Sequence, residues 1–303
     1  MRILDFKDKL NTPIAVALGF FDCIHKGHCL LVRSACEYAS AHLGVESALF
    51  TFSNDPSSCL TDKEKQIYNF DERAEALKNL GLENLIYTEF NKSFSSLEPI
   101  EFLDTLTENL NIKAVIIGHD YTFGKEAKGN ISLIRSYFKD KSVDVITVPY
   151  ERLDGKKIST SSLKALVKEG NIETLNSQLS EPYFMLGKVV HARHVGTELG
   201  FPTANINVSE TRLPLAEGVY ATILQADNRR YPSMTNVGAK PTFGIESPSI
   251  ETYILDFDGN LYDKTVKLSF VARMRDVFKF TSLDDLKNQL VHDKAQVGKL
   301  IKI

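Results

Sequence analysis

Short apolar runs alternate with amphipathic stretches through the first 180 residues of the chain. Aliphatic and β-branched composition predicts five strands buried on both faces, over residues 14–18, 46–52, 84–87, 114–117 and 144–148. Apolar residues at helical spacing predict helices between and after them, over 27–42, 70–80, 99–110, 132–138, 161–168 and 172–179. This alternation is typical of βαβ units with right-handed crossovers, so we expect a doubly wound α/β domain built on a parallel sheet.

The second part of the chain has a different pattern, which begins after Glu181 and Pro182. From residue 183 to about 275, short β-branched and aromatic runs are separated by Gly, Pro, Asn and Asp turns. This spacing favours an antiparallel barrel or sandwich. A last helix is predicted over 283–301, with acidic residues in its first turn. We therefore expect two domains, over residues 1–180 and 181–303.

Composition and charge limit the classes of function that the chain can have. Hydrophobic residues make up 43% of the 303 residues and charged residues 25%, which is ordinary for a globular protein. Because Lys and Arg total 36 against 39 Asp and Glu, there is no strong basic field to bind nucleic acid. The N-terminal sequence has no signal-peptide core and no run approaches 18 apolar residues, so we expect a cytoplasmic protein without a membrane partner.

All four cysteines lie in the first fifth of the chain, and reduced thiols are expected in such a protein. Cys23, His25, His28 and Cys29 offer four possible zinc ligands within seven residues. Structural zinc sites usually take ligand pairs from two separate segments, and four ligands this close would strain a tetrahedral geometry. The sequence therefore favours another role for the two histidines, with zinc binding as the alternative.

The most specific local pattern is the run GFFDCIHKGH, from Gly19 to His28, which directly follows the first buried strand. In an open α/β sheet, the first strand–helix turn presents free backbone N–H groups to ligand phosphates. Gly27 would let the backbone approach those phosphates, while His25 and His28 could donate hydrogen bonds to them. Helix capping or core filling is the alternative role for either histidine. The pair together with the glycine favours nucleotide binding.

This run is similar to the H-x-G-H signature of nucleotidyltransferases, and the whole chain resembles the bifunctional riboflavin kinase/FMN adenylyltransferases. In that family the first domain, of nucleotidyltransferase type, transfers AMP from ATP to FMN, giving FAD and pyrophosphate. The second domain is a flavokinase that makes FMN from riboflavin. The resemblance implies catalytic roles for His25 and His28. It also implies that ATP binds through a larger set of residues: Gly19, Phe21, Asp22, Gly27, Ser159, Thr160 and Lys164.

A second matching stretch, GHDYTFGK over residues 118–125, resembles the family's G-x-D-F-x-F-G-K pattern. Because it follows another strand of the predicted sheet, we expect it on the same ligand-binding edge. The resemblance implies that Asp120 and Phe123 help to form the flavin and adenine site. A core aromatic is the alternative role for Phe123.

In the second domain, GFPTAN over residues 200–205 resembles the riboflavin kinase signature, whose threonine and asparagine hold Mg²⁺ and the ATP phosphates. Thr203 and Asn205 are two residues apart, so on an extended strand both face one side and can share a hard cation. A simple turn is the alternative, since Pro, Thr and Asn are common in turns. The resemblance implies that Thr203 and Asn205 bind Mg²⁺ and ATP.

Glu251 begins the run ETYILDF, residues 251–257, which resembles the family's strand with a catalytic glutamate. A carboxylate at the mouth of an otherwise apolar strand is suited to take a proton from the terminal hydroxyl of riboflavin. A solvated strand end is the alternative. The resemblance implies that Glu251 is the catalytic base of the kinase.

Five of the positions that depart from the family's pattern bear on the two reactions. Cys23 replaces a glycine of the phosphate-binding turn, while Ser162 and Lys164 replace two arginines. Serine cannot make the bidentate phosphate contacts of arginine and lysine mimics them only in part, so slow adenylyl transfer is expected. In the kinase domain, Thr197 replaces an arginine and Val277 a glutamate. Neither is the expected base, so a usable kinase site is predicted.

Three functions follow from these observations. The leading hypothesis is a bifunctional enzyme that uses ATP and Mg²⁺ to convert riboflavin to FMN and FMN to FAD. A second hypothesis retains only one of the two activities, and a third is a non-catalytic flavin or nucleotide sensor. The His25/His28 pair and Glu251 favour the enzymes, whereas the lost arginines favour the sensor.

Overall fold

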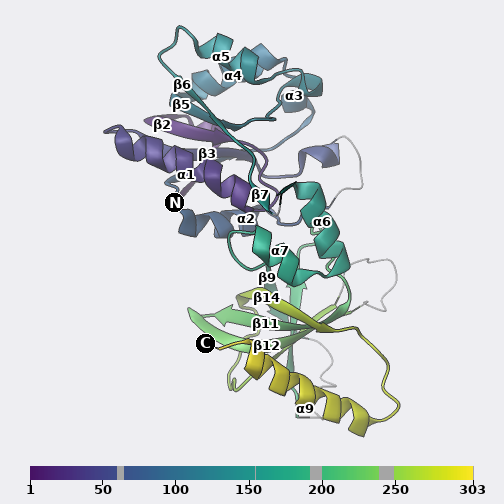
Figure 1. Ribbon diagram of the computed structural model, residues 1–303. Helices are drawn as coiled ribbons and strands as arrows, with labels where there is room; N and C mark the ends of the chain where they lie inside the picture. Colours follow the sequence, from purple (N-terminus) through teal and green to yellow (C-terminus); the bar gives the residue numbers. More distant parts are fainter. Residues whose placement is uncertain (60–64, 154, 192–199, 239–248, 303) are drawn as a thin grey trace. The chain divides into compact units, whose positions relative to one another are not determined.

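The computed structural model describes residues 1–59, 65–153, 155–191, 200–238 and 249–302 (Figure 1). The chain divides into two compact units, Met1–Ser159 and Thr160–Ile303, called here the first and second units.

A six-stranded parallel sheet forms the centre of the first unit (Figure 1). Its strands are β1 (Arg2–Asp5), β2 (Leu10–Leu18), β3 (Glu46–Phe52), β4 (Asn84–Thr88), β5 (Leu110–Gly118) and β6 (Asp144–Val148). They lie in the order β1-β4-β3-β2-β5-β6, and every neighbouring pair is parallel. The sheet confirms the predicted doubly wound domain. The sequence does not predict β1, because this four-residue edge strand has no buried side chain.

Helices cover both faces of this sheet, as Figure 1 shows. On one side lie α1 (Lys26–Ala41) and α2 (Phe70–Leu77); on the other lie α3 (Lys92–Ser95), α4 (Pro99–Asn109) and α5 (Ile131–Phe138). Polar side chains fix where α1, α2 and α5 begin, since His25, Asn69 and Asn130 each accept a hydrogen bond from a backbone N–H three residues on. On the α4 side, leucine and phenylalanine side chains from the helices pack against the sheet: Phe102, Leu103, Leu106 and Phe138.

The direction in which the chain crosses the sheet changes at β2, whose two neighbours are β3 and β5. In an open α/β sheet, ligands bind outside the carboxyl ends of the strands at such a switch point. Ala17 of β2 pairs with Ile116 of β5, so the two strands end at the same level. The segments that follow them are the two sequence runs singled out above, residues 19–28 and 118–125.

The second unit is a closed six-stranded barrel with three described helices. Its strands, in the order β10-β13-β12-β11-β14-β9, are antiparallel, which confirms the barrel among the two predicted architectures. Their bounds are β9 (Phe184–Val190), β10 (Thr203–Val208), β11 (Gly218–Ala226), β12 (Arg229–Gly238), β13 (Ser249–Ile254) and β14 (Thr265–Arg275). Before the barrel come α6 (Thr160–Glu169) and α7 (Ile172–Gln178).

The compact units divide at residues 159 and 160, whereas the sequence predicts a domain boundary at residue 180. The difference concerns α6 and α7, which belong to the second unit. The side-chain amide of Asn176 in α7 donates to the Phe270 carbonyl of β14 at 2.9 Å, and its oxygen accepts the Tyr183 N–H at 2.8 Å. Periodicity alone cannot show this, because it identifies an amphipathic helix without naming the sheet that the helix covers.

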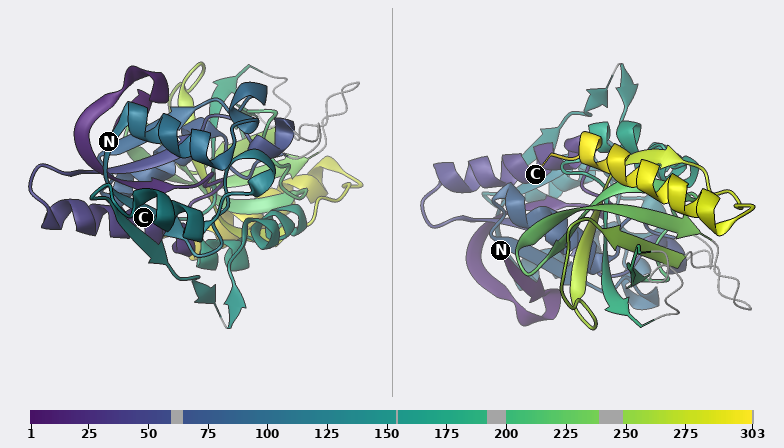
Figure 2. Two further views of the ribbon diagram at one scale, coloured as in Figure 1. Left: turned by 90° about the horizontal axis from the view of Figure 1, so that it is seen from above. Right: turned by 90° about the horizontal axis from the view of Figure 1, so that it is seen from below.

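The C-terminal helix α9 (Leu283–Leu300) runs along the outside of the barrel wall (Figure 2, right). Val297 and the following Ile301 pack with Val219, Ala221 and Met234, so a second apolar cluster lies between the helix and β11–β12. Ser282 caps the helix by accepting the Asp285 N–H. None of the helices in the described ranges has the length and apolarity needed to cross a membrane.

Candidate active sites

The turn after β2 has a tightly constrained backbone. Phe21 has a φ of 56°, in the left-handed region that non-glycine residues seldom adopt. A Cβ at Gly19 would lie 2.8 Å from the Phe21 ring, so the ring occupies the space that this glycine leaves. Asp22 is buried, and its Oδ1 accepts the Ile67 N–H at 2.8 Å, which ties the turn to the segment before α2.

A buried arginine of α2, Arg73, binds the backbone of the turn after β2. Nη1 of Arg73 donates to the Phe20 carbonyl at 2.9 Å, and its Nη2 donates to the Phe52 carbonyl at 2.7 Å. The Thr51 hydroxyl donates to the same Phe20 carbonyl at 2.6 Å. Burial lowers the pKa of Arg73 to about 10, so the guanidinium stays charged at neutral pH. The loops after β2 and β3 are therefore joined by a fixed cation.

His25 and His28 stack face to face at the start of α1, with ring centroids 3.6 Å apart. His25 Nδ1 accepts the His28 N–H at 3.2 Å, and His28 Nδ1 donates to the Cys23 carbonyl at 2.5 Å. Gly27 lies between them, where a Cβ would come within 3.0 Å of the His25 ring. The structure thus brings together three predicted site residues at the switch point of the sheet.

Burial keeps both imidazoles neutral. It lowers the pKa of His25 to about 4 and holds the pKa of His28 well below its ordinary value, which the neighbouring His25 lowers further. Because Nδ1 of His25 is an acceptor, its proton lies on Nε2; because Nδ1 of His28 is a donor, a neutral His28 leaves Nε2 free to take a proton. The pair therefore offers one N–H donor and one proton acceptor.

The segment after β5 contributes Asp120, whose Oδ2 lies 2.7 Å from Lys157 Nζ. Lys157 also lies over the Tyr150 ring, 3.8 Å from its centre. Phe123, in contrast, is 6% exposed and packs 5.3 Å from the Phe102 ring in the core cluster. The structure favours the alternative of a core aromatic for Phe123, and its contact with flavin stays a prediction.

The departures from the family's pattern have different surroundings. Cys23 is fully buried, and the left-handed residue of its turn is Phe21, so a glycine is not required at position 23. Ser159 ends the first unit, while Thr160, Ser162 and Lys164 belong to α6 of the second unit. Thr197 lies outside the described residues.

The zinc alternative has no support in the part of the chain that the structure describes. No three His, Cys, Asp or Glu side chains there are grouped to hold a metal ion.

A row of polar residues crosses three strands of the barrel. Glu251 of β13 pairs with Asn205 of β10 on one side and with Asn236 of β12 on the other. Glu251 is therefore the third residue of a central strand, which corrects the expectation that it lies at a strand mouth. Residue patterns could not predict this row, because strand pairing, not sequence distance, makes these three residues neighbours.

Two pockets meet beside this row. The larger, of about 630 Å³, is lined by Gly200, Pro202, Thr203, Tyr253 and the segment 256–262. The smaller, of about 260 Å³, is more apolar and is lined by Glu251, Asn236, Phe201, Met234, Phe278 and two leucines of α9, Leu286 and Leu290. Thr203 and Tyr253 line both pockets. Two ligands bound in them would approach each other near the Glu251 row.

Sequence patterns miss several residues of the smaller pocket, among them Asn236, Arg275 and Phe278. Asn236 becomes a neighbour of Glu251 only through the pairing of β12 with β13, which no pattern within its own segment shows. Val277 also lines this pocket and is 45% exposed, so the glutamate that it replaces would have lain at the pocket rim.

An ion pair fastens α9 over the smaller pocket. Asp293 is 1% exposed, and its Oδ2 lies 2.8 Å from Arg275 Nη2 and 3.0 Å from Arg275 Nε. The same guanidinium lies 4.8 Å from the centre of the Phe278 ring, a wall of the pocket. The pair therefore links the end of β14, the pocket wall and the helix.

We expect Asp293→Asn to destabilise the second unit by about 2 kcal/mol, because Arg275 would lose its buried counter-charge. This is less than the loss of about 3–5 kcal/mol for breaking a fully buried pair, since the Arg275 side chain is 17% exposed. Urea unfolding measures the change. The exposed Asp284→Asn on the same helix is the control; equal losses in both variants would contradict the role of the pair.

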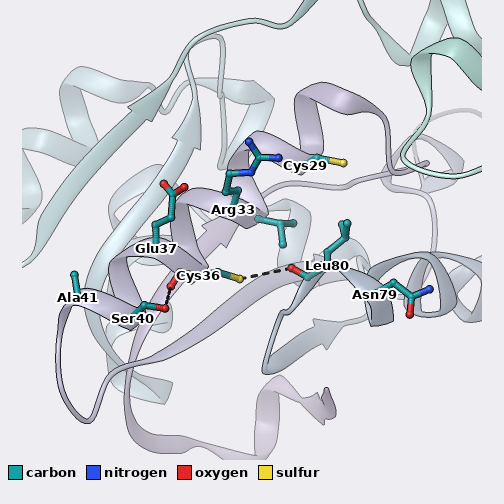
Figure 3. A pocket seen from close by; sticks show the side chains of 9 residues that line it. Cys29, Arg33, Cys36, Glu37, Ser40, Ala41, Asn79 and Leu80 are labelled. Atoms are coloured by element: carbon teal, nitrogen blue, oxygen red, sulfur yellow. Dashed lines mark hydrogen bonds between the residues drawn. The ribbon is translucent and has the colours of Figure 1, made fainter.

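A third cavity, of about 610 Å³, lies along α1 and is shown in Figure 3. Cys29, Arg33, Cys36 and Glu37 form its α1 side, and Leu80 faces them. The Cys36 thiol lies 3.9 Å from the Leu80 carbonyl, and burial raises the pKa of this thiol, so it is a weak nucleophile. None of the predicted catalytic residues lines this cavity.

Comparisons with known proteins agree with both halves of this arrangement. The family model for FAD synthetase matches residues 7–162, and the model for riboflavin kinase matches residues 179–301. The bifunctional riboflavin kinase/FMN adenylyltransferase of Bacillus subtilis is 33% identical over 287 residues, covering 93% of this chain and 90% of the relative. The Escherichia coli enzyme of the same name is 26% identical, covering 92% and 90%.

A crystal structure from Streptococcus pneumoniae, described as a macrolide-efflux protein, matches with a TM-score of 0.88 and 32% identity. The match covers 98% of this chain and 99% of the other. The residues at the switch point, the barrel with its two pockets and these matches lead to one conclusion. The chain belongs to the bifunctional riboflavin kinase/FMN adenylyltransferase family, enzymes that phosphorylate riboflavin to FMN and adenylylate FMN to FAD.

Proposed function

We propose that the first unit adenylylates FMN through His25 and His28 and that the second unit phosphorylates riboflavin through Glu251. The observation that carries the kinase assignment is the pairing of Glu251 with Asn205 and Asn236, beside two pockets that share Thr203 and Tyr253. One pocket is large enough for a nucleotide, and the other is apolar enough for a flavin ring. A sensor would not need a carboxylate between the two pockets, and matches of both halves to enzyme families support both activities over one alone.

In the kinase reaction, ATP occupies the larger pocket and riboflavin the smaller one. The terminal hydroxyl oxygen of riboflavin attacks the γ-phosphorus, and the bond from this phosphorus to the oxygen bridging to the β-phosphate breaks. The Glu251 carboxylate takes the proton of the hydroxyl, and ADP leaves with the electron pair of the broken bond. Among the described residues, no hydrogen bond or ion pair engages this carboxylate, so it is available as a base.

Mg²⁺ would be held by Thr203 and Asn205. These side chains offer one hydroxyl and one amide oxygen from the same strand, which are hard ligands of the kind that Mg²⁺ takes. Both ligands are neutral, so the ATP phosphates supply the remaining charge. The ion would neutralise charge on the transferring phosphoryl group.

In the adenylyl transfer, the ATP phosphates lie against the turn after β2. The Nε2–H of His25 donates to a phosphate oxygen, and His28 takes up a proton from solvent on Nε2 as ATP binds, because the phosphate charge raises its pKa. A phosphate oxygen of FMN attacks the α-phosphorus, the bond to the β-phosphate breaks, and pyrophosphate leaves. Asp120, held by Lys157, would contact the flavin or adenine.

The remaining predicted contacts are part of this proposal. Gly19, Phe21, Asp22 and Gly27 shape the turn that receives ATP, and Ser159, the last residue of the first unit, contacts its phosphates. For Thr160 and Lys164, binding of ATP stays a sequence prediction. Both reactions consume ATP, which supports work in an ATP-containing compartment, the cytoplasm.

We expect Thr203→Ala to raise the Mg²⁺ concentration needed for half-maximal FMN formation about tenfold, because a metal ligand is lost. High Mg²⁺ should restore most of the rate. Thr203→Ser keeps the hydroxyl and serves as the matched control, with a titration curve close to that of the wild type. A Thr203→Ala enzyme with an unchanged Mg²⁺ dependence would remove this residue from the metal site.

A further inference from the structure

Four hydroxyl side chains form a continuous ladder inside the barrel. Thr252 of β13, Thr235 and Ser233 of β12 and Thr222 of β11 are all 0% exposed. Their side-chain oxygens lie 2.9 Å apart for Thr252 and Thr235, 2.7 Å for Thr235 and Thr222, and 2.8 Å for Thr222 and Ser233. At the β11–β12 end, Ser233 Oγ also donates to the Thr222 carbonyl at 3.0 Å.

This polar ladder is unexpected in a barrel core. Interiors of small barrels are usually filled by apolar side chains, and apolar residues of the same shape would stabilise the barrel as well as bonded hydroxyls do. Hydroxyls instead require one another at fixed distances, since a buried hydroxyl without a partner is costly. The ladder therefore opposes a shift in register between neighbouring strands. Apolar side chains would resist such a shift less specifically, because they can pack in more than one register.

The ladder lies directly behind the kinase pocket. Side chains of a strand alternate between the two faces of the sheet. The chain neighbours of Thr252 are Glu251 and Tyr253, and those of Thr235 are Met234 and Asn236; all four line the smaller pocket. Thr252 and Thr235 pair directly across the strands, in the register that sets Glu251 opposite Asn236.

We propose that Thr235 and Thr252 are positioning residues for riboflavin phosphorylation, and that their interior hydrogen bond fixes the register in which Glu251 faces the flavin hydroxyl. The proposal rests on the assignment of Glu251 as the base. The two threonines act through the strands, since they point into the barrel and Glu251 points out of it. They take no part in proton transfer.

The same ladder supplies a matched control. Thr222→Val removes a hydroxyl from the ladder on the β11 side and leaves the Thr235–Thr252 bond in place. The chain neighbours of Thr222, Ala221 and Ile223, do not line the smaller pocket. Thr222→Val should therefore lower the melting temperature as much as Thr235→Val does, without the same effect on the reaction.

The test measures kcat and KM for FMN formation from riboflavin in the Thr235→Val, Thr252→Val and Thr222→Val variants. We expect Thr235→Val and Thr252→Val each to lower kcat about tenfold, since small misplacements of reacting groups can cost up to about 10². KM should change less than twofold, roughly, because the pocket walls remain. Thr222→Val should keep kcat within about twofold of the wild type, and Thr235→Ser, which restores the hydroxyl, should recover most of it.

Riboflavin binding by each variant, followed by the quenching of flavin fluorescence, counts the chains whose second unit is folded, and each rate is normalised to that number. Wild-type kcat in Thr235→Val or Thr252→Val would overturn the proposal, and so would equal losses of kcat in Thr222→Val and Thr235→Val. If Glu251 is not the base, the Glu251→Gln enzyme will still phosphorylate riboflavin. This result is different from those that would overturn the positioning role of the threonines, so the two failures can be told apart.

Discussion

His28→Ala is expected to slow FAD formation from FMN by at least about 10², the size of effect found when one donor to developing negative charge is removed. The imidazole is held by its Nδ1 bond to the Cys23 carbonyl and by stacking on His25, so alanine removes a fixed group and not a mobile one. The rate is measured by separating FAD from FMN after incubation with ATP and Mg²⁺. FMN formation from riboflavin should be unchanged.

His42→Ala is the matched control for this variant. His42 lies at the other end of α1, where it stacks on Tyr38 and its ring contacts the Tyr38 carbonyl at 2.8 Å. It is exposed and lies at no predicted site, so its loss should leave FAD formation unchanged. If His28→Ala forms FAD as fast as His42→Ala does, the histidine pair has no part in adenylyl transfer.

Glu251→Gln is expected to lower FMN formation by about 10²–10⁴, the usual contribution of a general base. Glutamine keeps the shape and the hydrogen-bonding capacity between Asn205 and Asn236 but cannot accept the proton. Binding of ATP should survive, because Thr203 and the walls of the larger pocket are intact. Added Mg²⁺ should not rescue the rate, which separates this variant from Thr203→Ala.

The exposed Glu210→Gln offers the corresponding control, since it removes a carboxylate from the same unit without touching either pocket. FAD formation from FMN should be the same in both variants. A Glu251→Gln enzyme that phosphorylates riboflavin at the rate of the Glu210→Gln enzyme would mean that another group is the base.

The sheet of the first unit could be predicted because its central strands are buried on both faces. Runs such as residues 14–18 and 114–117 are apolar without interruption, and the helices between them have clear periodicity. Edge strand β1 has no such run and depends on its pairing with β4. The run with His25 and His28 directly follows the first of these strands, so the sequence alone could assign both histidines to the ligand-binding edge. The strand order that makes this edge a switch point comes from the structure.

The sites in the barrel were less accessible to sequence reasoning, because they form across strands. Motifs identified Thr203, Asn205 and Glu251 singly, but their neighbours Asn236 and Phe278 come from other strands and from the segment before α9. For Phe123 the motif suggested a ligand contact, whereas in the structure the side chain packs in the core. A motif fixes a residue type in a segment, whereas register and burial decide what the side chain faces.

The most direct test of two separate active sites in one chain is a crossed assay of the wild type, His28→Ala and Glu251→Gln. Each enzyme receives ATP and Mg²⁺ with either riboflavin or FMN, and the flavins are separated by chromatography. We predict that the wild type converts riboflavin to FMN and then to FAD, that His28→Ala stops at FMN, and that Glu251→Gln makes FAD only from supplied FMN. Loss of both reactions in either variant, or a wild type that leaves one substrate unconverted, would contradict the assignment of one reaction to each unit.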